Sequence, residues 1–295
     1  MAIMQPGLVV AHTERVAEEL KHRFKGHPRQ ELDAWLRVAH QREAMVTRIY
    51  GLPEIRRRVP DAAEGGVPGV AAKVVKGIWA QEEGHTRLLG AVRLADGDRN
   101  PALEEIQGKL EGEVTLAGCS GSVFARLAIA IGAFFEQVPA FAKEIDAMTL
   151  LEFYGFCAEL EDTASHGYKR MIALSDAIVR EDSDDNPVFQ LPYELTRILL
   201  EERYHAAVLR CLAQWVEKDG NTFRGLQPKD CVLELRTLAN KHLHTFKARL
   251  THAQACGEPS QISAPPKTEE WISDGGMGDL FAEYGLSAPV VESKG

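Results

Sequence analysis

Two Glu-x-x-His motifs lie far apart in the chain, at Glu82–His85 and at Glu202–His205. On a helix, residues three apart lie on one face, so each motif can direct a carboxylate and an imidazole toward the same metal ion. Oxygen and nitrogen ligands without thiolate suit iron or manganese and also allow zinc. A single motif of this kind is common by chance, so the segments before the two copies decide whether the pair has a meaning.

A Glu-x6-Tyr pattern precedes each motif, first at Glu43–Tyr50 and then at Glu161–Tyr168. Seven residues make about two helical turns, so each tyrosine shares a helical face with its glutamate. The first glutamate precedes the glutamate of its Glu-x-x-His motif by 39 residues in one copy and by 41 in the other. The chain therefore contains a degenerate internal repeat, in which a helix with Glu and Tyr is followed by a helix with Glu-x-x-His.

The helical phase distinguishes these glutamates from the acids beside them. The neighbours of Glu161 on its own face are mostly apolar, which predicts that it points inward, whereas Glu159 shares its face with charged side chains. The same test predicts an inward orientation for Glu43, Glu82 and Glu202 and an outward one for Glu83 and Glu201.

Carboxylates in apolar stripes need compensating charge. An ionised carboxylate buried without a partner costs several kcal/mol or shifts its pKa until it is neutral. Two divalent metal ions would balance four such groups. The alternative is that these residues are surface acids and core histidines. The candidate metal ligands are Glu43, Glu82, His85, Glu161, Glu202 and His205.

The four-part pattern resembles the ferritin-like superfamily of di-metal carboxylate proteins, in which two helices supply one Glu each and two others supply Glu-x-x-His. The Glu-x6-Tyr detail is most similar to the rubrerythrin and erythrin branch. The resemblance covers roughly residues 31–217. It implies an all-α fold, a ferritin-like four-helix bundle with a long crossover and extra flanking helices. It also implies two Fe ions, with Fe/Mn or Mn as alternatives, in which Glu82 and Glu202 are bridging or terminal ligands and each ion has one imidazole.

The expected organisation has three parts. Residues 1–29 form an N-terminal extension, residues 30–256 form the helical bundle, and residues 257–295 form a flexible tail with a short docking helix. The expected helices cover residues 13–24, 30–50, 70–94, 143–180, 192–217 and 228–254. The crossover is expected over residues 97–145, with an apolar helix over 123–137 that packs on the bundle, walls a substrate pocket or forms the interface of a homodimer.

Composition excludes some classes of partner. The net charge of −9 argues against a nucleic-acid footprint, and no apolar run approaches the ~20 residues of a membrane span. The start of the chain lacks the pattern of a signal peptide, so a cytoplasmic location is expected. The 5 cysteines are dispersed without Cys-x-x-Cys, which is typical of reduced thiols. Rubrerythrins carry a rubredoxin-like iron site held by such motifs, so electrons here would come from a separate donor or from the substrate.

The expected activity is that of a non-haem di-iron oxidase or oxygenase that uses O2 on a small-molecule substrate, since much of the chain lies outside the ligand-bearing helices. A rubrerythrin-like peroxidase and an iron-storage or iron-handling protein remain alternatives. Tyr50 and Tyr168 are expected to be hydrogen-bond donors behind the ligands or electron relays, and the alternative is that they are ordinary core tyrosines. The run Arg56–Arg58 is either solvated or faces an anionic substrate.

Overall fold

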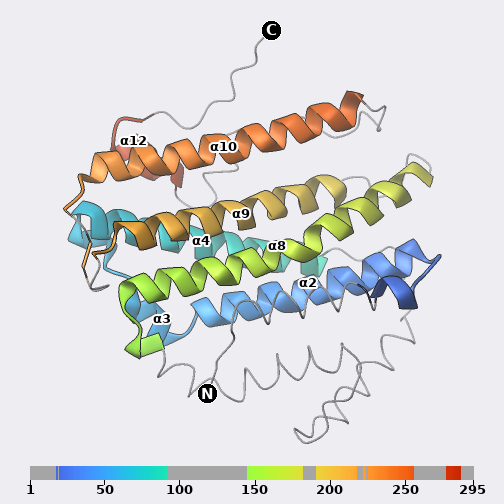
Figure 1. Cartoon of the computed structure of the whole chain (residues 1–295), viewed down its shortest axis with the longest axis horizontal. Helices are drawn as coiled ribbons and strands as arrows, with labels where there is room; N and C mark the ends of the chain where they lie inside the picture. Colours follow the sequence, from blue (N-terminus) through green and yellow to red (C-terminus); the bar gives the residue numbers. More distant parts are fainter. Residues whose placement is uncertain are drawn as a thin grey trace, which may run out of the picture.

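The computed structural model describes residues 18, 20–91, 145–181, 191–217, 222–223, 225–255 and 277–286, and the regular structure of this part of the chain is helical (Figure 1). The prediction of an all-α protein is confirmed for these residues. The elements are α2 (Pro28–Tyr50), α3 (Pro53–Arg58), the short 3-10 helix η1 (Ala62–Glu64), α4 (Gly66–Ala91), α8 (Leu150–Glu181), α9 (Leu191–Trp215), α10 (Pro228–Ala255) and α12 (Met277–Glu283).

The long helices lie side by side along the longest axis of the molecule (Figure 1). Helix α2 packs on α4 and on α8, while α9 packs on α8 and more lightly on α4. Helix α10 lies against α9 and α4, and α12 contacts α4 and α10. These four helices, α2, α4, α8 and α9, carry the predicted repeat, so both copies of it face a common interior.

Local signals explain where the helices begin and end. Helix α2 starts at Pro28, whose fixed φ suits the first helical turn, and ends at Tyr50, with Gly51 as its C-cap. Helix α8 was expected from residue 143 but begins at Leu150. The reason is a cap, because Glu152 accepts from the backbone N–H of Thr149 at 2.8 Å while the Thr149 hydroxyl accepts from the N–H of Glu152 at 3.2 Å. The pattern therefore predicted the helix but missed the cap that starts it.

Two apolar clusters divide the interior along its length. One cluster includes Val46, Val75, Tyr154 and Leu209 and the other includes Leu36, Leu89, Met171 and Leu199, all of them buried. Each such side chain contributes about 1.5–3 kcal/mol when fully buried. Each of the four helices crosses from one cluster to the other, and the predicted ligands lie where it crosses.

Helices α2 and α8 approach closely at Gly167. A Cβ atom at this position would lie 3.1 Å from Cζ3 of Trp35, so the missing side chain leaves room for the indole ring. The buried carboxylate of Glu31 on α2 accepts two hydrogen bonds from Arg170 on α8, at 2.7 and 2.8 Å. These contacts hold in register the two helices that carry the Glu-x6-Tyr segments.

Several expectations lie partly or wholly outside the described residues. The crossover and its apolar helix fall there, as does the proline-rich start of the tail, and the three-part domain division stays a prediction. Within the helix expected over residues 13–24, Leu20 and Phe24 are buried. The tail contributes α12, whose Leu280 and Phe281 are buried. No helix within the described residues is long and apolar enough to cross a membrane.

Candidate metal site

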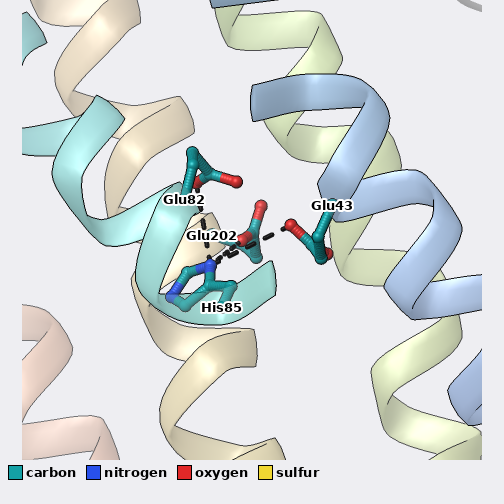
Figure 2. Close-up of side chains that lie close together, drawn as sticks. All are labelled: Glu43, Glu82, His85 and Glu202. Atoms are coloured by element: carbon teal, nitrogen blue, oxygen red, sulfur yellow. Dashed lines mark ion pairs between the residues drawn. The ribbon is translucent and has the colours of Figure 1, made fainter. Parts of the chain in front are cut away.

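The predicted ligands from all four helices meet in the interior. Two overlapping groups of side chains place their ligand atoms within 4.8 Å of one another. The first group is Glu43, Glu82, His85 and Glu202, and the second is Glu82, Glu161, Glu202 and His205. Figure 2 shows the first group, with Glu43 reaching in from α2, Glu82 and His85 from α4, and Glu202 from α9. Glu82 and Glu202 belong to both groups, so each has a ligand atom within 4.8 Å of both histidines.

Burial follows the predicted helical phase for most of these acids. The four glutamates and His205 have no exposed surface, and His85 is 2% exposed. Glu83 is exposed, and the side chain of Glu159 is 45% exposed and paired with Arg210. The acids beside the site on α4 and α8 therefore face outward, as the phase of these helices predicts.

The side-chain atoms that face the centre have no hydrogen-bond partner among the described residues. They are both carboxylate oxygens of Glu82 and of Glu202, one oxygen (Oε2) of Glu43 and of Glu161, and the Nδ1 atoms of His85 and His205. Buried polar groups in proteins are almost always paired, because an unpaired one costs about 1–3 kcal/mol. Eight such atoms converge at one place, where their residues form the two groups that could hold a metal ion.

The distances between these atoms fit metal coordination. His85 Nδ1 lies 2.9 Å from Glu202, 3.7 Å from Glu82 and 4.0 Å from Glu43. His205 Nδ1 lies 2.9 Å from Glu82 and 3.4 Å from Glu161. Ligand atoms bound at about 2.1 Å to one octahedral ion are separated by about 3 to 4 Å, so the spacing of these donor atoms is compatible with a metal site.

The outer nitrogen of each histidine is held by the other repeat. His85 Nε2 lies 2.7 Å from a carboxylate oxygen of Glu201, and His205 Nε2 lies 2.8 Å from the amide oxygen of Gln81. Such contacts fix the ring and leave Nδ1 directed at the centre, as at known metal sites. The two partners occupy equivalent positions, each directly before the glutamate of a Glu-x-x-His motif.

The expected outward orientation of Glu201 is wrong. Glu201 is 3% exposed, although it shares its helical face with the charged residues Glu194 and Arg197. That face turns inward locally because α4 covers it and supplies His85 as a partner. Gln81 was not singled out by the sequence. Both Gln81 and Glu201 directly precede a Glu-x-x-His motif. This position points to a role only once it is known that each histidine contacts the other repeat.

Each of the two tyrosines donates a hydrogen bond to a glutamate of the other repeat. Tyr168 donates a hydrogen bond to Oε1 of Glu43 at 2.6 Å, and Tyr50 donates to Oε1 of Glu161. Each tyrosine therefore occupies the outer oxygen of a glutamate and leaves the inner oxygen unpaired. Tyr50 also lies against Trp79, with 6.0 Å between the ring centroids. The two tyrosines lie behind the predicted ligands.

Burial and crowding shift the protonation of the cluster. Burial raises the pKa of Glu82 well above 4.5, and the charges of the neighbouring carboxylates raise it further. Burial also raises the pKa of Glu202, with Glu43 adding to it. For His85, burial lowers the pKa, but the contacts with Glu201 and Glu202 outweigh it and the net pKa is raised. Without added positive charge, the cluster retains protons that a metal ion would displace.

One glutamate behaves differently. Burial raises the pKa of Glu161, but the close approach of His205 and the hydrogen bond from Tyr50 outweigh it, and the pKa of Glu161 ends below 4.5. Beside it, burial raises the pKa of the Cys157 thiol, and the charge of Glu161 adds to this. Cys157 is therefore a protonated thiol next to the site, which agrees with a ligand set without thiolate.

Other charged or reactive residues are not members of the two candidate metal-binding groups. Arg57 pairs with Glu54 and Asp146 at the surface, and Arg58 donates to the carbonyl oxygen of Met148. His242 packs its ring on Tyr204, and burial lowers its pKa to about 4. Cys157, Cys211 and Cys231 are free thiols. Among the described residues, the groups that could hold a metal ion are the two that share Glu82 and Glu202.

Comparison with known proteins finds no protein family that matches the chain, no similar curated protein and no similar solved structure. The inference about function therefore depends on the geometry of the site itself.

Proposed function

We propose that the chain is a non-haem di-iron oxidase or oxygenase that uses O2 on a small-molecule substrate. Glu43 and His85 would hold one ion, and Glu161 and His205 would hold the other. Glu82 and Glu202 would be shared by both. Two iron ions bound there would supply two electrons to O2, and Fe/Mn or two Mn ions are the alternative occupants.

The observation that carries this proposal is the set of unpaired carboxylate oxygens and imidazole nitrogens that converge between the helices. Four carboxylates in a water-excluded interior repel one another, and two divalent cations would neutralise the charges of these four groups. Packing of an apolar core does not require these polar groups to lie together. Metal binding would account for the position of each unpaired atom.

The arrangement of the helices supports the same interpretation. The first repeat folds as α2 and α4 and the second as α8 and α9, and each repeat supplies half of the cluster. A ferritin-like four-helix bundle, which we propose for these helices, builds its di-metal site in this way. The analogy concerns the arrangement of the metal ligands, because a shared fold does not identify the substrate.

The protein side chains have identifiable tasks in such a centre. Tyr50 and Tyr168 would hold the glutamates of the opposite repeat, and Glu201 and Gln81 would hold the imidazoles. The apolar clusters on both sides would keep bulk water away from the ions. Tyr50 also contacts the partly exposed ring of Trp79, which supports a role for it in passing electrons from a separate donor.

A peroxidase of the rubrerythrin kind is the second candidate, because a tyrosine hydroxyl stands behind a glutamate at both halves of the cluster. The two activities differ in their oxidant. Anaerobically loaded ferrous protein should be oxidised rapidly by O2 if the first proposal holds. Oxidation that is fast with H2O2 and slow with O2 would favour the peroxidase.

The experiment is to load the protein with Fe(II) without oxygen, add O2 and follow its consumption with an electrode. The matched control is the double variant E82Q/E202Q, which keeps the shape of the shared ligands but removes their charge. We expect O2 uptake in the original chain, about one O2 or less per two irons, and none above background in the control. Equal uptake in both proteins would contradict the proposal. Screening of small molecules for faster O2 uptake would then identify the class of substrate.

A further inference from the structure

The outer partners of the two histidines differ in charge. His85 Nε2 is held by the carboxylate of Glu201 at 2.7 Å, and His205 Nε2 is held by the neutral amide of Gln81 at 2.8 Å. The two contacts are otherwise alike in distance, in burial and in their place beside the motif. The site is thus nearly symmetric in shape and asymmetric in charge.

The difference in charge affects how strongly each imidazole binds a cation. A hydrogen bond from imidazole N–H to a carboxylate places more electron density on the opposite nitrogen than a hydrogen bond to an amide does. The Nδ1 of His85 is therefore the stronger donor of the pair. The buried carboxylate of Glu201 also adds a negative charge near the position around His85, where little solvent screens it.

The guanidinium of Arg42 opposes this effect. Arg42 Nη2 lies 4.0 Å from Oε1 of Glu43, on the same side of the site as His85. Its contact is longer than the contact of Glu201 with His85, and its side chain is 15% exposed. The closer and more buried group is the carboxylate, so it dominates.

We propose that the two metal positions are unequal, and that the position around His85 binds the first divalent ion more tightly than the position around His205 because Glu201 rather than an amide holds its imidazole. The inference rests on the proposed metal site. It makes Glu201 and Gln81 positioning residues that set the order of filling. Since the positions differ, the site is suited to sequential loading and to holding two different metals.

The test measures each position separately with Mn2+ as the probe. His205→Ala leaves the position around His85 intact, and His85→Ala leaves the one around His205. We expect titration calorimetry to give a dissociation constant about 10-fold or more lower for His205→Ala than for His85→Ala, in line with the effect of outer partners at other metal sites.

Exchange of the outer partners isolates their contribution from that of Arg42. In an E201Q background, where both partners are amides, the ratio of the two constants should approach one. In a Q81E/E201Q background, where the partners are swapped, the ratio should invert. The same ratio in every background, or tighter binding by His85→Ala in the original background, would overturn the proposal.

A second measurement keeps all ligands in place, in case a histidine variant fails to fold. With half an equivalent of Co2+, the exchangeable Nε2–H proton of the coordinated imidazole gives a shifted proton resonance. We expect E201Q to move or broaden that resonance and Q81E to leave it unchanged, because the first ion occupies the position around His85. Sensitivity to Q81E alone, or equal sensitivity to both changes, would overturn the inference. If the original chain binds neither Mn2+ nor Co2+, the metal site itself is refuted, whereas binding with two equal positions refutes only the asymmetry.

Discussion

At the scale of single residues, the site gathers eight buried polar atoms that have no hydrogen-bond partner among the described residues. The outer atoms of the predicted ligands are held by hydrogen bonds from the opposite repeat, while the inner atoms are unpaired. A chain that evolved only to pack its core would replace such groups with apolar ones, which cost less to bury. The cluster therefore costs stability, and we infer that it is kept for binding.

Glu161 and Glu159 provide a direct test of individual ligands. Replacing Glu161 by Ala should reduce bound metal from about two ions per chain to one or none, because it removes a terminal carboxylate from the cluster. Replacing Glu159 by Ala is the matched control, since its side chain is 45% exposed on the same helix. Metal analysis after desalting measures both. Full occupancy in the Glu161→Ala protein would show that this residue is not a ligand.

The sequence predicted which residues lie close together but not the hydrogen bonds that hold them in place. Periodicity and the internal repeat indicated the inward orientation of Glu43, Glu82, Glu161 and Glu202, since a helical face follows from spacing alone. The roles of Gln81 and Glu201 depend on contacts between α4 and α9, which local spacing does not encode. The crossed pairing of each tyrosine with the other repeat was missed for the same reason.

At the scale of elements, the position of the site depends on how α2 and α8 are aligned. These helices carry Glu43 and Glu161 and are joined by the pair between Glu31 and Arg170. The pair is bidentate, which fixes both distance and orientation. A shift of one helix by a single residue would turn its glutamate away from the centre.

Loss of this pair should be measurable in the metal-free protein. Arg170→Ala leaves the buried carboxylate of Glu31 without its partner, and we expect unfolding to become easier by about 1–2 kcal/mol, a value reduced because Arg170 is partly exposed. Arg37→Ala is the control, since it breaks an exposed pair with Asp33 on α2 alone and should cost less than about 0.5 kcal/mol. Chemical denaturation measures both. Equal losses of stability in the two variants would show that the pair between Glu31 and Arg170 contributes no more than an exposed pair.

The long helices could be predicted because their apolar residues recur with a regular period. The residues at which they begin and end were predicted less accurately. The cap of Thr149 and Glu152 moves the start of α8 inward from the predicted residue. The short elements α3 and η1 lie between the helices expected over residues 30–50 and 70–94, where no helix was expected. A few residues contain too little periodicity to separate a helix from a loop.

At the scale of the whole molecule, the buried cluster couples stability to pH. The pKa of Glu82, of Glu202 and of His85 is raised in the folded chain. The folded chain therefore holds more protons than the unfolded chain above the ordinary values of 4.5 for the carboxylates and 6.5 for the imidazole. Under this condition, stability falls as the pH rises.

The metal-free protein should accordingly become less stable between pH 5 and pH 8, with a slope of up to about 1.4 kcal/mol per pH unit for each proton involved. Glu161 acts in the opposite sense, since its lowered pKa gives a stabilisation that is lost as the pH falls below 4.5. Urea titrations across this range measure the slope. Glu82→Gln should flatten it and stabilise the metal-free chain at neutral pH. A stability that rises with pH would contradict the burial of these groups as acids.

The count of iron ions per chain tests the central claim most directly. The protein is loaded anaerobically with Fe(II), exposed to air and desalted, and its iron content and particle size are then measured together. We expect about two irons per chain without a large assembly, because the six side chains form two overlapping groups of ligands. An absence of bound iron would contradict the di-iron centre. Tens or hundreds of irons per chain in a large particle would instead indicate storage.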